Sequence, residues 1–224
     1  MSIPKIIHYC WFGDGPISPE SRKCMESWKK YCPDYKIMAW NEQNFDISAN
    51  RYARQAYAAK KYAFVSDYVR LAVLYEYGGI YLDTDVELVR PLDELLEHKG
   101  FIGMEHSMPT PYGRTLLVNT GSGVGAEPGC GMIGKMLASY RNAAFVQETG
   151  EPDLRTCTQR DTPLFAKAGL QQKNEQQELD GFLVLPTDCF SPFDYVTERM
   201  HRTPRTFGIH YYSGSWQSGN KVNR

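Results

Sequence analysis

At 224 residues the chain has the length of one α/β domain that can bury a full hydrophobic core, and we expect a single domain over residues 1–224. Its 25 Lys and Arg residues are balanced by 26 Asp and Glu, which argues against a nucleic-acid binder that relies on a general basic field. The six cysteines form no C-x-x-C pair, and no signal peptide or transmembrane run is visible, so we expect a cytosolic protein with reduced thiols.

The first 40 residues predict a β-α-β unit. Residues 5–12 are apolar and rich in β-formers, and the glycines and proline after them indicate a turn. Ser18 followed by Pro19 is typical of a helix start, and this helix is expected to run to about Lys30. Residues 35–40 form a second predicted strand. Such a unit opens the sheet of many nucleotide-binding proteins.

Trp11 leaves the first predicted strand at its carboxyl end, where sheets of this kind bind their ligands. Its indole has a shape that can stack on a nucleobase. By pattern alone, an ordinary core position fits Trp11 equally well.

Residues 63–77 predict a helix that is apolar almost all round, and Asp67 and Arg70 interrupt it. Their i, i+3 spacing places them on one face of the helix. A buried ion pair is one interpretation, although desolvation can cancel the attraction between such charges. The alternative that we favour is a pair aimed at sugar hydroxyls, since a carboxylate accepts from hydroxyls and a guanidinium donates to them.

A double glycine, a short apolar strand and two carboxylates follow in residues 78–85. Side chains alternate along a strand, so Asp83 and Asp85 should point the same way, with Cα atoms roughly 7 Å apart. Such a pair is unfavourable unless a cation joins it, and Mg²⁺ or Mn²⁺ prefers oxygen ligands. A polar turn is an equally simple interpretation of the two aspartates alone. A calcium loop is less consistent, because its later glycine and glutamate are missing.

The rest of the chain predicts further strands and helices around one glycine-rich segment. Residues 120–131 contain five glycines without the context of a dinucleotide motif, and we expect a flexible or tightly turned segment that follows Asn119. The expected strands are residues 86–89, 101–104, 116–118, 182–185 and 206–212; the expected helices are residues 91–96, 132–141 and 162–168; and residues 190–195 are an expected loop.

The last predicted strand ends in a polar and aromatic stretch. His210 offers an imidazole as a third metal ligand for the aspartates, and Ser213 and Ser215 offer hydroxyls to phosphate oxygens. Trp216 adds an indole N–H donor. A lone histidine is more often structural than a ligand, so the assignment of His210 depends on its neighbours.

Three stretches together resemble a known enzyme family. Residues 3–13 (IPKIIHYCWFG), 63–85 (AFVSDYVRLAVLYEYGGIYLDTD) and 210–216 (HYYSGSW) resemble the DXD-containing sugar transferases of glycosyltransferase family 32. That family includes bacterial capsular-polysaccharide enzymes and yeast α-mannosyltransferases, and it is distantly similar to the glucosyltransferase domains of clostridial toxins. The resemblance covers nearly the whole chain in the family's order, and residues 190–195 resemble a loop of bacterial members.

The resemblance implies a GT-A fold, which is a Rossmann-like mixed sheet flanked by helices. It also implies a nucleotide-sugar donor, with a UDP-sugar favoured over a GDP-sugar, a Mn²⁺ or Mg²⁺ ion, and retention of anomeric configuration. The expected acceptor is a glycan or lipid-linked saccharide in surface polysaccharide synthesis. The expected location is the cytoplasm, with peripheral association at the inner face of the membrane.

The resemblance also assigns roles to residues of this chain. Asp85 and His210 would bind the metal together with Asp83, which would also contact sugar or ribose; Trp11 would stack on the base, Asp67 and Arg70 would hold the donor sugar, and Ser213, Ser215 and Trp216 would hold the diphosphate. The toxins carry a glutamate near the position of His210. The glycine-rich segment departs from the family's pattern and leaves the role of Asn119 open.

Two alternatives of other classes remain. Phosphotransferases of the haloacid dehalogenase type also carry D-x-D after an apolar strand, but Glu87 stands where their motif usually has Thr or Val. A catalytically inactive nucleotide-sugar-binding module is disfavoured by the intact Asp83, Asp85 and His210. For a transferase we expect a same-face reaction in which the leaving phosphate helps to deprotonate the acceptor, because no side chain is an obvious covalent nucleophile.

Overall fold

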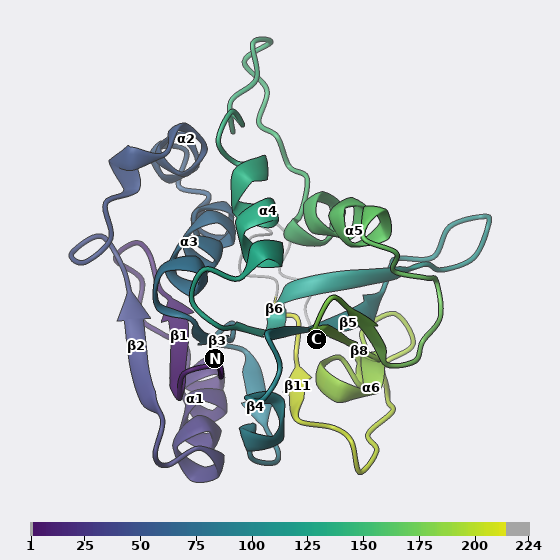
Figure 1. Cartoon of the computed structure of the whole chain (residues 1–224). Helices are drawn as coiled ribbons and strands as arrows, with labels where there is room; N and C mark the ends of the chain where they lie inside the picture. Colours follow the sequence, from purple (N-terminus) through teal and green to yellow (C-terminus); the bar gives the residue numbers. More distant parts are fainter. Residues whose placement is uncertain (1, 214–224) are drawn as a thin grey trace.

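A seven-stranded mixed sheet forms the centre of the computed structural model, which describes residues 2–213 (Figure 1). The strand order is β2-β1-β3-β6-β5-β8-β7. Neighbours are parallel in the pairs β1–β2, β1–β3 and β5–β8, and antiparallel in β3–β6, β5–β6 and β7–β8. The strands are β1 Ile6–Cys10, β2 Lys36–Trp40, β3 Gly79–Tyr81, β5 Gly100–His106, β6 Leu116–Ala126, β7 Gln177–Leu179 and β8 Phe182–Leu185. The predicted α/β class is confirmed.

Helices cover both faces of this sheet. In Figure 1, α3, α4 and α5 lie on one side, while α1 and α6 lie on the other. The helices are α1 Pro19–Tyr31, α2 Arg51–Ala58, α3 Tyr62–Tyr77, α4 Gly131–Ser139, α5 Cys157–Lys167 and α6 Thr187–Phe190, with 3₁₀ turns η1 Ile47–Ala49 and η2 Asp93–Leu95. Within the described part of the chain, no helix is both long and apolar enough to cross a membrane.

Two small antiparallel sheets complete the fold. The first pairs β4 (Val86–Leu88) with β11 (Gly208–His210), and the second pairs β9 (Phe193–Asp194) with β10 (Arg199–Met200). The β4–β11 pair lies directly after the DXD stretch, so it connects that stretch to the last described segment of the chain.

Two apolar clusters, one on each side of the sheet, hold the layers together. Tyr52, Phe64 and Phe165 are fully or almost fully buried on the side of α3. Trp28 and Phe101 are fully buried on the side of α1. Each such side chain stabilises the fold by about 2–3 kcal/mol through the apolar area that it removes from water.

Local signals in the sequence explain where several helices begin and end. The Ser18 side chain accepts a hydrogen bond from the amide of Ser21 at 3.0 Å, and proline takes the first position of α1. Gly78 ends α3 with a φ of 64°, a left-handed conformation that favours glycine. Both boundaries agree with the predictions from sequence.

The first part of the glycine-rich segment is a strand, so the prediction of a flexible or tightly turned segment is wrong for residues 120–126, and a turn follows only at residues 128–129. Residues up to Ala126 belong to β6, which is buried at almost every position. A register shift lies between Ile102 and Gly103 of β5, where the pairing moves from Val124 to Asn119. Glycine is needed because a Cβ at Gly123 or Gly125 would lie 2.6 Å or 2.3 Å from the ring of Phe190 or Phe101. The expected strand end at Asn119 is therefore inside a longer strand.

Two further boundaries differ from the predictions. Helix α5 begins at Cys157 rather than residue 162, because Thr156 and Gln159 form a capping box one turn before Pro163. The expected loop over residues 190–195 contains the end of α6 and the strand β9, which pairs with β10.

Candidate active site

The DXD stretch forms a turn between β3 and β4. The amide of Val86 donates to the carbonyl of Asp83 at 3.0 Å, and the amide of Asp83 donates to the carbonyl of Gly121 in β6 at 2.9 Å. The β4–β11 pairing sets His210 opposite Val86. As a result, ligand atoms of Asp83, Asp85 and His210 all lie within 4.8 Å of one another.

Asp85 and His210 form a buried acid–imidazole pair. His210 Nε2 lies 3.4 Å from Asp85 Oδ1, and the amide of Ser213 donates to Asp85 Oδ2 at 2.8 Å. Burial raises the pKa of Asp85, but His210 and Ser213 outweigh burial and hold this pKa well below its usual range. Burial lowers the pKa of His210, but the neighbouring carboxylates, Asp85 first, raise it above its ordinary value.

Arg70 joins the helix α3 to the DXD turn. Its Nη2 lies 3.2 Å from Asp67 Oδ1 and 3.2 Å from Asp83 Oδ1, and Nη1 donates to Thr120 Oγ1 at 3.2 Å. The guanidinium also lies over the ring of Tyr81, 4.7 Å from its centroid. Burial raises the pKa of Asp67 to about 6, although Arg70 opposes this shift. The ion pair exists, and it extends to the predicted metal site rather than ending within the helix.

Asn119 of β6 and Glu105 of β5 lie at the same end of two neighbouring strands, and the sequence analysis gave neither of them a role in the site. Asn119 Nδ2 donates to Glu105 Oε2 at 2.6 Å, and Asn119 Oδ1 accepts from the amide of Gly121 at 2.7 Å. Burial raises the pKa of Glu105. Asn119 therefore holds the β6 backbone that supports Asp83. The signal was present, since Glu105 follows the apolar run 101–104 as Asp83 follows residues 80–82.

Asp161 of α5 is a second buried acid that the sequence analysis did not single out. It is fully buried, and both carboxyl oxygens lack a hydrogen-bond partner among the described residues. Burial raises its pKa to about 8, with the charge of Asp67 adding to the shift. The acid is therefore mainly protonated at neutral pH, and it adds no full negative charge behind Asp67.

Comparison with known proteins identifies the region around this site. Residues 18–102 match the family model described as "Glycosyltransferase sugar-binding region containing DXD motif". This part of the chain is similar to the DXD-containing sugar-binding region of glycosyltransferases. The predicted resemblance to family 32 is confirmed at this level, and the prediction of a glycosyltransferase is supported with it.

Curated relatives of this glycosyltransferase region come from Schizosaccharomyces pombe. Inositol phosphoceramide mannosyltransferase 3 is 33% identical over 112 residues, which are 45% of this chain and 29% of the relative. Inositol phosphoceramide mannosyltransferase 1 is 29% identical over 111 residues, 45% of this chain and 33% of the relative. The matched part is thus a third or less of these relatives' length.

Two solved glycosyltransferase structures are similar in fold. "PaToxG Glycosyltransferase" has a TM-score of 0.51 at 23% identity, over 75% of this chain and 72% of that chain. A glycosyltransferase involved in the glycosylation of the major capsid of PBCV-1 has a TM-score of 0.50 at 11% identity, over 93% and 95%. Together with the mixed sheet, these likenesses confirm the predicted GT-A-like architecture.

Of the other predicted site residues, the structure describes some and not others. Trp11 follows β1 and is half-buried, and its indole N–H donates to the carbonyl of Gly15 at 2.7 Å. This bond leaves the indole face, not its N–H, for a ligand. Ser213 reaches Asp85 through its backbone amide. Ser215 and Trp216 lie outside the described residues, so their assignment to the diphosphate stays a prediction.

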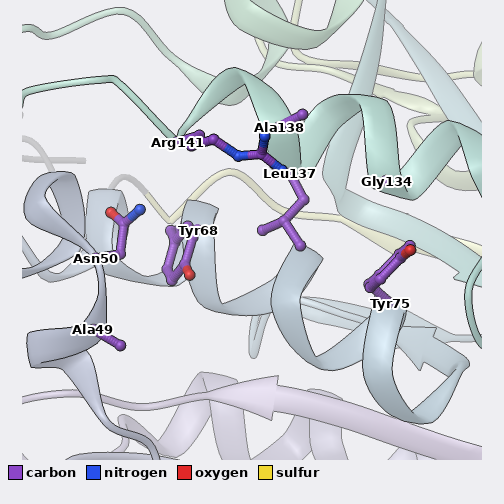
Figure 2. Close-up of a pocket in the computed structure, with 8 residues that line it drawn as sticks. All are labelled: Ala49, Asn50, Tyr68, Tyr75, Gly134, Leu137, Ala138 and Arg141. Atoms are coloured by element: carbon purple, nitrogen blue, oxygen red, sulfur yellow. The ribbon is translucent and has the colours of Figure 1, made fainter.

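One cavity of the described structure is separate from this site. It has a volume of about 370 Å³ and lies between η1, α3 and α4, where Tyr68 and Tyr75 face Leu137 (Figure 2). None of the described site residues lines it.

Proposed function

We propose that this chain is a metal-dependent, retaining hexosyltransferase that uses a nucleoside diphosphate sugar. The observation that carries the proposal is the convergence of Asp83, Asp85 and His210, with Arg70 joining Asp83 to Asp67. A UDP-sugar remains the favoured donor. A GDP-sugar is the alternative, and three relatives named as mannosyltransferases make a mannosyl donor worth testing.

The set of side-chain ligand atoms in Asp83, Asp85 and His210 fits a hard divalent cation. Two carboxylates and one imidazole supply oxygen and nitrogen ligands of the kind that Mn²⁺ accepts and Mg²⁺ partly shares. His210 Nδ1 is buried without a hydrogen-bond partner among the described residues, which supports a ligand at this side chain. Asp83, Asp85 and His210 would hold the ion, which supplies positive charge against the diphosphate as the sugar leaves.

The residues around Arg70 are suited to holding the donor sugar. Asp67 and Asp83 can accept hydrogen bonds from sugar hydroxyls, and their carboxylates tolerate positive charge on the sugar ring. Arg70 fixes both carboxylates from one planar group, so their spacing is set before the donor binds.

Retention is proposed to follow from reaction on one face of the sugar. The bond between the anomeric carbon and the diphosphate oxygen breaks, and the acceptor oxygen forms its bond on the same face. The acceptor proton passes to the leaving diphosphate. The proposed setting, synthesis of a surface polysaccharide at the cytoplasmic face of a membrane, rests on the family resemblance.

The test is release of nucleoside diphosphate from a donor panel. The purified protein is incubated with Mn²⁺ and with UDP-glucose, UDP-galactose or GDP-mannose, with EDTA as the control. A transferase releases nucleoside diphosphate slowly even without an acceptor. Release of phosphate from simple phosphomonoesters would indicate a phosphotransferase instead, and neither activity would indicate a binding module.

A further inference from the structure

A second cavity, of about 430 Å³, adjoins the site on the side of α6. Its wall comes from four segments: the ends of the β5–β6 connection at His106 and Arg114, Asn174 before β7, the stretch from α6 to Tyr195, and the stretch that ends at Arg205. Tyr212 closes the wall toward the DXD turn. This volume is within the range of pockets that bind small ligands.

Aromatic rings connect this cavity to the metal-ligand cluster. The rings of Tyr195 and Tyr212 have centroids 4.7 Å apart, and Tyr212 in turn lies 4.1 Å from the imidazole of His210. Tyr212 has a φ of 51°, a left-handed conformation that is costly for a tyrosine. The chain keeps this conformation at a ring that both lines the cavity and contacts His210.

Both arginines of the cavity wall are neutralised by carboxylates. Arg114 Nη1 lies 2.5 Å from Asp194, and Arg114 also donates to the carbonyls of Ser107 and His106. Burial raises the pKa of Asp194, but Arg114 and nearby amides outweigh it and lower the pKa to about 2.

Arg205 makes the matching pair on the other side of the cavity. Its Nη2 lies 2.9 Å from Asp188, which also accepts from Arg205 Nε at 3.2 Å. Burial and the charge of Arg114 lower the pKa of His106. Both guanidinium groups are thus already matched, while hydroxyl, amide and carboxylate groups remain to bind hydroxyls.

We propose that this cavity is the acceptor subsite and that it binds an uncharged hexose unit of a saccharide. The assignment as an acceptor subsite rests on the proposed function, whereas the binding of a neutral saccharide does not. Tyr195 offers an aromatic face to the sugar ring, and the hydroxyl, amide and carboxylate groups of the wall offer partners to its hydroxyls. An anionic headgroup, such as the inositol phosphate in the relatives' names, would have to compete with Asp188 and Asp194 for the two arginines.

Ligand-observed NMR with saturation transfer tests the subsite directly. The probes are the methyl α-glycosides of glucose, galactose and mannose, with myo-inositol 1-phosphate as the anionic comparison. Each is measured with UDP and Mn²⁺ present, so that the donor site is not the place of binding. The variants are Tyr195→Ala and Tyr195→Leu, and the control is Tyr112→Ala, which changes a fully exposed tyrosine on the β5–β6 connection.

We expect at least one methyl hexoside to bind, and both Tyr195 variants to weaken it about tenfold, or about 1.4 kcal/mol. The Tyr112→Ala protein should bind as the unchanged chain does. Absence of binding by every hexoside, equal binding by the Tyr195 variants, or preference for inositol phosphate would overturn the proposal.

A kinetic measurement separates the subsite from the proposed function. In a chain that hydrolyses a donor, the hexoside that binds should accelerate release of nucleoside diphosphate, and Tyr195→Leu should lower the ratio of transfer to hydrolysis about tenfold. An unchanged ratio contradicts the acceptor role. If the unchanged chain hydrolyses no donor, the proposed function fails, while the NMR result still decides whether the cavity binds a saccharide.

Discussion

Arg70 is the residue that fixes the carboxylates of the site relative to one another. One guanidinium contacts Asp67, Asp83 and Thr120, lies over Tyr81, and approaches the Cys157 sulfur at 3.8 Å. It is almost fully buried, whereas Asp83 keeps 30% of its side chain exposed. A planar fork can meet these partners simultaneously, whereas a single ammonium cannot.

Arg70→Lys should therefore reduce kcat by about tenfold or more while the protein still folds. Turnover of the best donor is measured per folded molecule, with unfolding followed by circular dichroism. Arg90→Lys is the matched control, because Arg90 pairs with Glu94 in a more exposed setting. If Arg70→Lys only lowers thermal stability and keeps turnover, the ion pair is structural.

Asp85→Asn tests the metal ligands. The change removes one anionic ligand and almost no volume, so we expect a loss of Mn²⁺-dependent turnover beyond about 100-fold. Mn²⁺ should raise the melting temperature of the unchanged chain, because a ligand that binds only the folded state stabilises it. That rise should be missing from Asp85→Asn and present in Asp180→Asn, whose side chain is fully exposed. Comparable activity of Asp85→Asn at saturating Mn²⁺ would contradict the proposed metal site.

At the scale of elements, β6 brings its backbone close to the site because Gly121 has no side chain. A Cβ at Gly121 would lie 2.2 Å from Asp83 Oδ2 and 3.2 Å from Arg70 Nη1. Asn119 fixes this part of β6 through Glu105 and the amide of Gly121. The backbone of β6 thus positions the DXD turn.

Gly121→Ala should displace Asp83 and reduce turnover by about tenfold or more, with a modest loss of stability of about 1–3 kcal/mol from overpacking. Gly131→Ala is the control in the same segment, since a Cβ there meets no atom within 4 Å. Turnover and chemical denaturation are measured for both variants. Equal activities would show that Asp83 can shift without consequence.

Strands β1, β2 and β3 are joined through His8, which makes stability depend on pH. His8 Nε2 lies 2.8 Å from the carbonyl of Gly78, and Trp40 donates to Nδ1 at 3.0 Å, so the ring is neutral with its proton on Nε2. Burial lowers the pKa of His8 to about 4 from 6.5. The unfolded chain binds the proton more readily, so this contribution is present above pH 6.5 and is lost as the pH falls toward 4.

We expect the free energy of unfolding to fall by about 2–3 kcal/mol between pH 6.5 and pH 4 on account of His8. Urea titrations over this range measure the fall. His8→Gln should be less stable at pH 7 and should show a flatter pH profile. A profile of unchanged slope in His8→Gln would assign the proton uptake to another group.

The sequence predicted the elements that have local signals. Ser18 and Pro19 mark the start of α1, Gly78 marks the end of α3, and the carboxylates after β3 mark the site. It predicted only residues 116–118 of β6 and missed the continuation to Ala126, because glycine has low strand propensity and the glycines there make room for rings or a carboxylate from distant elements. The roles of Glu105 and Asn119 depend on β5–β6 pairing, which residue patterns do not specify.

At the scale of the whole molecule, the site combines residues from α3, the DXD turn, β6 and β11. The pairing of β4 with β11 brings the β11 residue His210 together with the site residues of the other three elements. Phe207 and Ile209 anchor β11 in the apolar layers. The cavity with Tyr195 then lies next to the site rather than within it.

Two truncations test this arrangement. A chain that ends at residue 213 keeps Asp83, Asp85 and His210, so the rise in melting temperature with Mn²⁺ should persist, while loss of Ser215 and Trp216 should lower kcat. A chain that ends at residue 205 loses β11, and we expect both lower stability and no response to Mn²⁺. Full turnover in the first truncation would mean that Ser215 and Trp216 do not hold the diphosphate.

The β4–β11 pairing also determines the order in which the site assembles during folding. Arg70 and Asp83 are 13 positions apart, whereas Tyr211 and Glu87, which hydrogen-bond across β11 and β4, are 124 apart. Closing the longer loop costs about 2 kcal/mol more in chain entropy. The arginine–carboxylate half should form early, and His210 should arrive late. A chain still emerging from the ribosome would therefore have the arginine–carboxylate half of the candidate site before His210 joins Asp83 and Asp85.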